Sequence, residues 1–361
     1  MIKEDEGRLK IESSKFKMTK AIELINKVEN EPEPKIIWNG IVEGSKGLIV
    51  GVSKTGKTTL AENLGMSLAI GRKDFIGYPL SGTPEKVLFV NLEEGYRLRS
   101  RRNLKQTAAL TKEEVELFKE NYYSTPTDFP QFLTTDRDWS DVSEYISESD
   151  AKYVFIDSLS HMFEGQIETS APAIAFVKKF REYITSLDKT IIVVHHNTKG
   201  NEKPIDQDSI AGSRIIAQEF EYAIGLANIP THTGGNYMCM LYNKYIEKDD
   251  TTAVLYKVNA DSWVQNIGTA NKFDLYKDVK IDYRMLSKNK HILYDYFIGK
   301  SSQGSITIET RELKEHFVDS KIMSKMTFHD NINLLVDEGK IVRTDKGMYE
   351  LNNLKIINNA E

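Results

Sequence analysis

An eight-residue segment sets narrow limits on the fold of this chain, because it matches the pattern G-x-x-x-x-G-K-[S/T]. Its residues are Gly51, Val52, Ser53, Lys54, Thr55, Gly56, Lys57 and Thr58. An apolar strand is predicted directly before it, at residues 47–50, and a helix at 58–70. Between a strand and a helix, such a loop lets backbone N–H groups surround phosphate oxygens at the positive helix N-terminus. The segment therefore predicts a phosphate-binding turn in an α/β fold.

The side chains of this turn predict binding of ATP and Mg²⁺. Lys57 can reach the β- and γ-phosphates, the Thr58 hydroxyl can bind Mg²⁺, and Thr59 continues the helix beside them. Lys54 lies inside the loop but not at its start, where some ATPases carry a second signature lysine, so only a place in the loop is assigned to it. The alternative is a chance match in a glycine-containing turn, which the flanking strand and helix disfavour.

Further short apolar runs predict a mostly parallel central sheet. Strands are expected at residues 86–92, 153–157 and 190–194, and their nearly continuous apolar character suits strands that are buried on both faces. Helices are expected between them, at 112–121 and 171–187, which gives the alternating order of an open α/β sheet. Strands at 222–226, 238–243 and 252–258 would extend this sheet on one edge.

Three of these strands end in side chains suited to nucleotide chemistry. Asp157 is a candidate Mg²⁺ ligand of the Walker B kind. Glu93 and Glu94 follow another strand, where a carboxylate can deprotonate the attacking water, and Glu93 is the favoured base. His195 and His196 end a third strand, and either could respond to loss of the γ-phosphate. The alternatives are a strand-ending aspartate, solvated loop glutamates and a core histidine without a role in catalysis.

The chain is expected to have three parts, at residues 1–35, 36–270 and 271–361. The first is an arm or linker with one amphipathic helix, ended by two prolines at 32 and 34. The second is the α/β nucleotide-binding domain. In the third, helices at 286–298, 310–317 and 324–338 and a hairpin at 341–351 predict a winged helix, the hairpin-bearing form of the helix-turn-helix.

Composition restricts where such a protein works. A formal charge of −5 argues against a surface that coats nucleic acid or anionic membrane, so any nucleic-acid contact must be a local patch. The single cysteine, Cys239, excludes an internal disulfide framework. The charged N-terminal segment lacks an apolar signal core, and no apolar run is long enough to span a membrane. We therefore expect a cytoplasmic protein.

The chain from about residue 38 to 258 resembles the RecA-like ATPases of the RepA-type plasmid replicative helicase group, relatives of DnaB helicases and RadA recombinases. The resemblance depends on the order of several motifs rather than on the phosphate loop alone. They are Gly51 to Thr58, residues 70–79 leading into 87–94, Asp157-Ser158, His195-His196 with Lys199, and Gly212-Ser213 with Arg214.

This resemblance implies a RecA-like fold and a homo-oligomeric ring, such as a hexamer, with ATP bound between subunits. A basic residue of the neighbouring subunit would complete the site, and the matching candidates are Arg214 and Lys244. The family usually has a lysine and an arginine together on the later strand, whereas this chain has only Lys244 and Lys248. The resemblance also implies that loops at 160–170 and 199–213 contact single-stranded DNA.

Charges in these regions leave two functions open. Lys199 and Lys203 favour DNA in the second loop, while Glu164 and Glu168 oppose it in the first. The winged helix mixes both signs, so it could bind duplex DNA or a protein. The cationic side chains of the winged helix are Lys321, Lys325, His329, Arg343 and Lys346, and the anionic ones are Asp330, Asp337 and Glu338. The sequence thus predicts an ATP-driven motor on DNA, a helicase, with an ATP-controlled binding switch as the alternative.

Overall fold

The computed structural model describes residues 18–165, 169–197, 203–212, 214–230, 234–247, 249–276, 288–302 and 307–352. The chain divides into two compact units, residues 1–279 and 280–361. Each unit has a hydrophobic core of its own and is described by itself. In the described part of the chain, no helix is long and apolar enough to cross a membrane.

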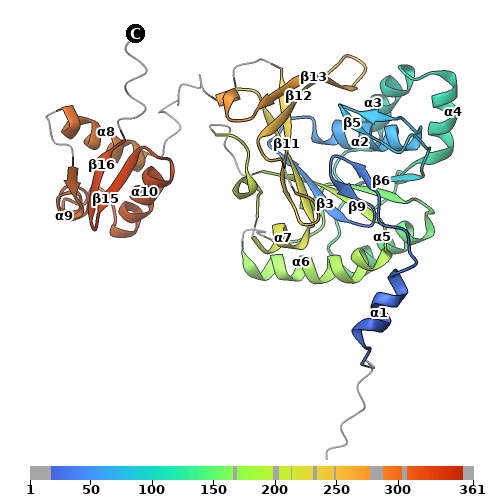
Figure 1. Ribbon diagram of the computed structural model, residues 1–361, viewed down its shortest axis with the longest axis horizontal. Coiled ribbons are helices and arrows are strands. Elements are labelled where there is room, and N and C mark those ends of the chain that lie inside the picture. The colour runs from blue at the N-terminus through green and yellow to red at the C-terminus, as the bar shows by residue number, and fades with distance from the viewer. Residues whose placement is uncertain are drawn as a thin grey trace, which may run out of the picture. The chain divides into compact units, whose positions relative to one another are not determined.

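A nine-stranded sheet forms the centre of the first unit, in the order β13-β12-β11-β10-β3-β9-β8-β6-β7 (Figure 1). Six strands are mutually parallel: β3 (Lys46–Gly51), β6 (Val87–Asn91), β7 (Tyr122–Ser124), β8 (Tyr153–Asp157), β9 (Thr190–His196) and β10 (Tyr222–Asn228). Three antiparallel strands extend it beyond β10: β11 (Asn236–Asn243), β12 (Thr252–Val258) and β13 (Val264–Asn271). This arrangement confirms the predicted α/β class, the mostly parallel sheet and the extension on one edge.

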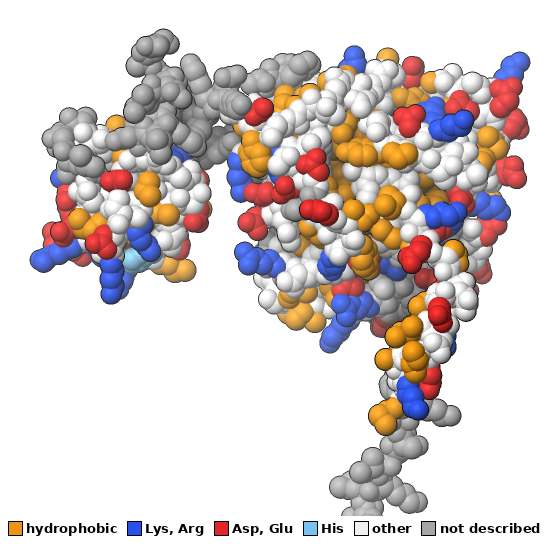
Figure 2. Space-filling model, viewed as in Figure 1, with side chains coloured by type: hydrophobic (Ala, Val, Ile, Leu, Met, Phe, Trp, Pro, Cys, Tyr) orange, Lys and Arg blue, Asp and Glu red, His pale blue; other side chains and the backbone are white. Residues whose placement is uncertain are grey.

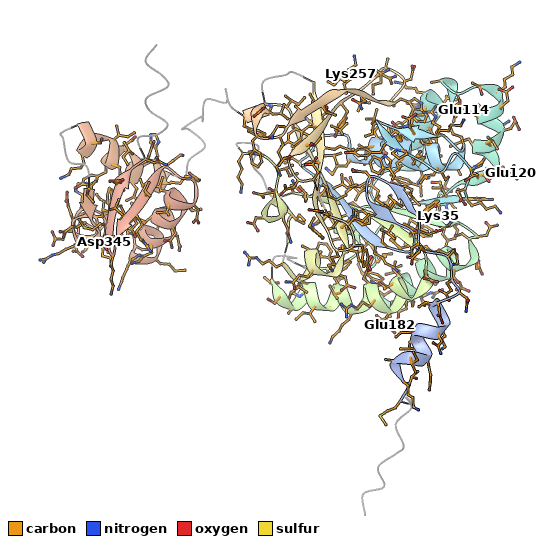
Figure 3. The ribbon with its side chains drawn as sticks, in the orientation of Figure 1. Lys35, Glu114, Glu120, Glu182, Lys257 and Asp345 are labelled. Carbon is orange, nitrogen blue, oxygen red and sulfur yellow. The ribbon has the colours of Figure 1, made fainter. Side chains whose placement is uncertain are left out.

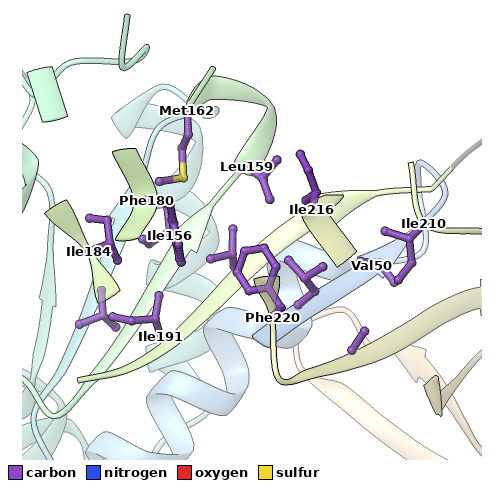
Figure 4. Close-up of a cluster of buried hydrophobic side chains, with 14 of the residues drawn as sticks. Val50, Ile156, Leu159, Met162, Phe180, Ile184, Ile191, Ile210, Ile216 and Phe220 are labelled. Atoms are coloured by element: carbon purple, nitrogen blue, oxygen red, sulfur yellow. The ribbon is translucent and has the colours of Figure 1, made fainter. Parts of the chain in front are cut away.

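Helices cover both faces of the sheet. Side chains alternate between the faces along each strand, so each face carries apolar side chains that a helix layer can bury. In β3, Leu48 and Val50 belong to one core and Ile49 to the other. The first core packs beneath α5 (Asp136–Glu148), α6 (Ser170–Tyr183) and the short α7 (Arg214–Glu219), and Figure 4 shows part of it. The second packs beneath α2 (Lys57–Ala69). The central strands β3, β6, β8, β9 and β10 are therefore buried on both sides, as their apolar runs predict.

Smaller elements complete this unit. Two hairpins pack on the second core: β1 (Ile36–Trp38) with β2 (Ile41–Val42), and β4 (Asp74–Phe75) with β5 (Tyr78–Pro79). Helices α3 (Tyr96–Ala108) and α4 (Lys112–Asn121) connect β6 to β7. The amphipathic helix expected in the arm is α1 (Ala21–Val28), and hydrophobic side chains gather along it in Figure 2. All its residues are exposed.

The second unit contains helices and a small antiparallel sheet. Its helices are α8 (Lys288–Ser302), α9 (Thr310–Lys314), which continues as a π-helical turn over residues 315–319, and α10 (Lys325–Asp337). The strands β14 (Thr307–Glu309), β15 (Ile341–Asp345) and β16 (Met348–Leu351) pair in the order β14-β16-β15. Phe297, Leu313, Phe328 and Leu335 bring all three helices into one core.

Several elements were not anticipated from the sequence. The helices α3 and α5 and the strands β7, β13 and β14 all lie in segments for which no element was predicted. In α3 the cause is composition, since only two of its thirteen residues, Arg99 and Gln106, are buried, and both are polar. A helix that buries polar side chains has no apolar stripe to recognise.

Candidate nucleotide site

The segment between β3 and α2 forms a tight turn that suits phosphate binding. Gly56 precedes α2 with a φ of 79°, a left-handed conformation that glycine adopts without strain. At Gly51 a Cβ atom would lie 2.5 Å from the carbonyl oxygen of Leu226, so the neighbouring strand leaves no room for a side chain. Thr55 is buried, and its Oγ1 donates to the Val52 carbonyl at 2.9 Å. The loop thus presents its backbone to a ligand.

The other residues of the turn differ in exposure. Ser53 and Lys54 are exposed, and Lys54 has a φ of 68°. Thr59 lies partly buried in the first turn of α2. The Lys57 side chain is buried, and its Nζ donates to the Val52 carbonyl at 3.0 Å. Burial lowers the pKa of Lys57, and the charges of Asp157 and Glu93 oppose that shift. The Lys57 side chain thus folds back over its own loop to the Val52 carbonyl.

Thr58 and Asp157 are brought together from separate elements. The Thr58 Oγ1 donates to Asp157 Oδ2 at 2.5 Å. Asp157 is buried, and its other oxygen, Oδ1, has no hydrogen-bond partner among the described residues. Burial raises the pKa of Asp157 to about 6. An unpartnered carboxylate oxygen beside a hydroxyl is a donor set that suits Mg²⁺, so the residues fit the predicted ion.

Glu93 lies just beyond the end of β6 and faces β9. Its backbone N–H donates to the Asp157 carbonyl at 3.2 Å, which holds it beside the metal-binding candidates. The Glu93 Oε2 lies 3.8 Å from His196 Nε2, and both side chains are about 40% exposed. Contact with His196 lowers the pKa of Glu93 well below its ordinary value, although burial opposes the shift. Glu93 is thus ionised and open to solvent at the sheet edge.

Glu94 has different surroundings. Its carboxylate accepts from Arg102 of α3, with Nη1 to Oε1 at 3.0 Å and Nη2 to Oε2 at 2.5 Å. Arg102 also donates to Glu62 of α2, which is fully buried, at 2.6 and 2.9 Å. Burial acts to lower the pKa of Arg102, but the hydrogen bonds to both glutamates outweigh it and raise that pKa. Glu94 therefore belongs to an ion cluster, Glu62–Arg102–Glu94, that links α2 and α3.

The two histidines at the end of β9 point in different directions. His195 is buried, its Nε2 lies 2.8 Å from the Ala211 carbonyl, and its Nδ1 has no partner among the described residues. Burial lowers the pKa of His195 to about 4, so the ring is neutral at neutral pH. His196 is the one that faces Glu93. His195 is thus fixed to the segment after β9, whereas His196 contacts the site.

Of the two candidates for a residue acting on a neighbouring subunit, Lys244 lies away from the loop of its own chain. Asn243 at the end of β11 pairs with the start of β10, so Lys244 lies at the sheet edge opposite Gly51. The Lys244 Nζ donates to the Gln218 carbonyl at 2.7 Å. Arg214 is exposed at the start of α7. Lys244 therefore does not contribute to this chain's own loop.

The predicted DNA-contacting loops are only partly described. Glu168 and residues 198–202, which include Lys199, lie outside the described residues, as do Ser213 and Lys248. Lys203 is exposed and its Nζ contacts Asp206 at 2.8 Å. In the first loop, residues 159–161 form a 3-10 turn and Leu159 is buried. A surface shared by the two loops therefore stays a prediction.

Some residues that shape the site were missed in the sequence. The buried Tyr256 on β12 donates its hydroxyl to the Thr55 carbonyl at 2.6 Å. On the same strand, a methyl group of Val258 lies next to Gly56. Asn197 donates its N–H to the Gly51 carbonyl at 3.2 Å. Arg102 and Glu62 form the cluster behind Glu94. No motif marks these positions, because each supports the loop through ordinary strand or helix residues.

The loop, the Lys57 ammonium and the Thr58–Asp157 pair lie together at the carboxyl edge of a mostly parallel sheet, where such sheets bind ligands. They define a P-loop nucleotide-binding protein.

Comparison with known families agrees with this class. Residues 12–202, more than half of the chain, match the model of the AAA domain family. The chain therefore belongs to the AAA domain family, and it is a RecA-like P-loop ATPase. That membership implies a bound nucleotide at the loop.

Two individual proteins are similar to this chain. The DNA repair protein RadA of Halalkalibacterium halodurans is 25% identical over 206 residues, which are 53% of this chain and 37% of RadA. The chain thus matches little more than a third of that relative's length. The KaiC-like protein PH0186 of Pyrococcus horikoshii OT3 aligns with 64% of this chain and 99% of its own, at 14% identity and a TM-score of 0.47.

Proposed function

We propose that this protein is an ATP-hydrolysing motor that acts on DNA, a helicase of the RepA and DnaB kind in replication or maintenance of a mobile element. The observation that carries the proposal is the meeting of the P-loop, Asp157 and the Glu93–His196 pair at one sheet edge. The RadA relative is named as a DNA repair protein, which supports DNA as the partner.

Hydrolysis would use the residues in defined roles. Loop amides and Lys57 bind the β- and γ-phosphates, and Lys57 leaves the Val52 carbonyl to do so. Mg²⁺, held by Thr58 and Asp157, would neutralise charge on the phosphates. Glu93 accepts a proton from water as the water oxygen attacks the γ-phosphorus and the bond to the bridging oxygen breaks. The products are ADP and inorganic phosphate.

The histidines would connect this reaction to the rest of the unit. His196 faces Glu93, so it can respond when the γ-phosphate departs. His195 contacts the Ala211 carbonyl within the 199–213 loop that the resemblance assigns to DNA. Movement of β9's end would therefore reach that loop directly. We assign the first response to His196 and the transmission to His195.

Oligomerisation would complete the site. Lys244 lies at the opposite sheet edge from its own P-loop, so it can reach a nucleotide only on another subunit. Arg214 is exposed and is the second candidate for that role. A ring, such as a hexamer, would place each subunit's basic residue against its neighbour's ATP.

The unit at residues 280–361 would be a winged helix. Its three helices and the β15–β16 hairpin suit that module, and α10 would be its recognition helix. Lys325 and Lys346 are exposed and could contact phosphates, while Asp337 and Glu338 are negative. We propose duplex DNA or a protein partner for this unit.

ATP hydrolysis measured with and without single-stranded DNA tests the motor. We expect stimulation by DNA, unwinding of a forked duplex, and loss of both in Lys57→Ala. The matched control is Lys178→Ala, which removes an exposed lysine on α6, and it should behave as the unaltered protein. Light scattering with a non-hydrolysable ATP analogue should give a ring. Hydrolysis without stimulation or unwinding would reject the motor.

One observation favours the alternative, an ATP-controlled binding switch without helicase activity. The Lys244 ammonium is already bound to the Gln218 carbonyl of its own chain, and no arginine accompanies it at the end of β11. A monomer or dimer in light scattering, together with a Lys57→Ala variant that keeps its partner affinity but loses nucleotide control, would support the switch.

A further inference from the structure

Helix α3 carries an unusual concentration of positive charge. Its thirteen residues include four arginines and a lysine and no acidic residue. Two of the arginines point inward and have partners. Arg99 donates from Nη1 and Nη2 to Thr125 at 3.1 Å each, and Arg102 belongs to the cluster with Glu62 and Glu94. These two are explained by the fold.

The other three cations have no acidic partner among the described residues, although Arg97 Nε donates to the Tyr96 hydroxyl at 3.2 Å. Arg97, Arg101 and Lys105 are exposed and are spaced four residues apart, so they form one stripe along α3 with a rise of about 6 Å per step. None of the ion pairs between described residues includes them. Like charges at this spacing destabilise a helix. The stripe therefore leaves repulsion that a bound anion would relieve.

Apolar side chains border the stripe. At 100° per residue, Leu98 and Leu104 lie on its two sides, and they are 63% and 70% exposed. Tyr96, at the start of the helix, is 43% exposed, and the Arg97 guanidinium lies 5.7 Å from its ring. Cations that follow a chain of phosphates, next to apolar and aromatic faces for sugars and bases, are the surface that single-stranded nucleic acid binds.

We propose that the stripe Arg97–Arg101–Lys105 binds the backbone of single-stranded nucleic acid. The inference deepens the proposed function, on which it rests, by naming a surface outside the 160–170 and 199–213 loops. Glu93 and Glu94 precede α3, and Glu94 is paired with Arg102. Further acidic side chains lie on the next helix, where Figure 3 labels Glu114 and Glu120 on α4. The leucines flank the cations instead of forming a continuous apolar face, which disfavours insertion into a membrane.

The position of α3 gives such a contact access to the nucleotide site. The helix begins two residues after Glu94, and Glu93 lies one residue further back. Arg102 fixes the same helix to Glu62 of α2, the helix that starts at Lys57. Nucleic acid bound to α3 would therefore be linked to Glu93 through the chain and to α2 through the Arg102–Glu62 ion pair.

The test compares two variants of the full-length chain that lose the same charge. One is Arg97→Gln/Arg101→Gln/Lys105→Gln. The control is Lys119→Gln/Arg137→Gln/Lys178→Gln, which removes three exposed cations from other helices. Glutamine keeps helix propensity, and circular dichroism checks that both variants remain folded. Binding of a fluorescent oligo(dT) is measured by anisotropy over a range of salt concentrations.

For the stripe variant we expect a slope of log K against log salt that is smaller by about 2, and binding weaker on the order of 100-fold at about 0.1 M salt. The control should keep the slope of the unaltered chain. Equal losses in both variants, or no loss in the stripe variant, would overturn the stripe. Failure of the unaltered chain to bind oligo(dT) would also remove the proposed motor on DNA.

Competition identifies the class of partner. Unlabelled oligo(dT) should displace the probe far better than poly-glutamate or anionic phosphatidylserine vesicles. If poly-glutamate competes as well as oligo(dT), the stripe binds an acidic protein and the nucleic-acid proposal is overturned. If only the vesicles compete, a lipid surface is the partner instead.

Discussion

Glu93 and Glu94 are adjacent in sequence but lie in two regions with opposite physical properties. At the sheet edge, Glu93 is half exposed, with His196 at 3.8 Å and with Ser158 and His161 also acting on its carboxylate. Behind it, Glu94 is bound by Arg102, which also holds the buried Glu62. A carboxylate held by a guanidinium through two hydrogen bonds is not free to orient an attacking water molecule. The comparison separates a residue available for chemistry from one that holds helices together.

The charged groups of the two regions also contribute differently to the free energy of folding. Ions in the cluster lost water on burial, and their mutual attraction offsets that cost only while all the partners remain. At the sheet edge, Asp157 is buried with one oxygen unpartnered and its pKa raised to about 6. At the sheet edge, the ionised Asp157 therefore destabilises the ligand-free protein. In the cluster, Arg102 compensates the charges of Glu62 and Glu94.

The largest expected effect comes from Glu93→Gln. Removing the proposed base should slow ATP hydrolysis by about 10²–10⁴-fold, while nucleotide affinity stays within a few-fold, because the loop and Lys57 are unchanged. Steady-state phosphate release and binding of a fluorescent ATP analogue measure the two quantities. Glu94→Gln is the matched control and should lose less than about tenfold in rate. If Glu94→Gln were the more damaging change, the assignment of the base would be reversed.

Glu62→Gln should have the next largest effect, on stability. Loss of this fully buried charge leaves Arg102 with Glu94 alone, and we expect the free energy of unfolding to fall by about 3 kcal/mol. Urea denaturation followed by circular dichroism measures the change. Glu114→Gln is the control, because that carboxylate contacts Arg72 at 3.4 Å near the surface and should cost less than about 1 kcal/mol. Equal costs would mean that the buried cluster contributes no more than a surface pair.

The sheet-edge residues could be predicted from sequence, while the cluster could not. Asp157 and His196 end strands whose apolar runs are visible in the chain, and parallel strands bring their ends to one edge. The sequence left Glu93 and Glu94 as alternatives, because residues after a strand's end do not reveal which way they turn. That choice depends on Arg102, which lies in a helix without an apolar stripe.

The support that β12 gives to the P-loop could not be predicted from the sequence either. The contact of Tyr256 with Thr55 joins residues 201 positions apart, and it depends on the register of three antiparallel strands beyond β10. Strand existence was predicted, but register depends on pairing that a single sequence does not specify. The sheet class was therefore accessible from local patterns, whereas the contacts that support the site arise from tertiary packing.

Asp157→Asn tests the electrostatic cost at the sheet edge. Burial raises the pKa of Asp157 from the ordinary 3.8 to about 6 in the folded state, so ionisation of Asp157 opposes folding. This destabilisation is absent below about pH 4, grows between about pH 4 and about pH 6, and levels off at about 3 kcal/mol above that. Without Mg²⁺ and nucleotide, the variant should be more stable than the unaltered chain at about pH 8 and equal at about pH 4. Thermal unfolding across this range measures the gain, and Asp150→Asn, which is exposed, should show none.

The smallest effect at neutral pH is expected for His196→Gln, whose consequence is a change in pH dependence. His196 keeps the pKa of Glu93 low, so its loss should let that pKa rise toward the ordinary 4.5. At about pH 7.5 Glu93 stays ionised either way, and the rate of hydrolysis should change less than about tenfold. With saturating Mg²⁺ to keep Asp157 ionised, the acidic limb of the pH–rate profile should move to higher pH.

His161→Gln provides the comparison for this shift, because His161 is a lesser influence on the pKa of Glu93 and hydrogen-bonds with Ser158 at 3.1 Å. Its acidic limb should move less than that of His196→Gln. An unmoved limb in His196→Gln would mean that the 3.8 Å contact does not control the charge of Glu93. The low pKa of Glu93 would then depend on Ser158 and His161, and the roles of β9 and β6 at the sheet edge would be independent.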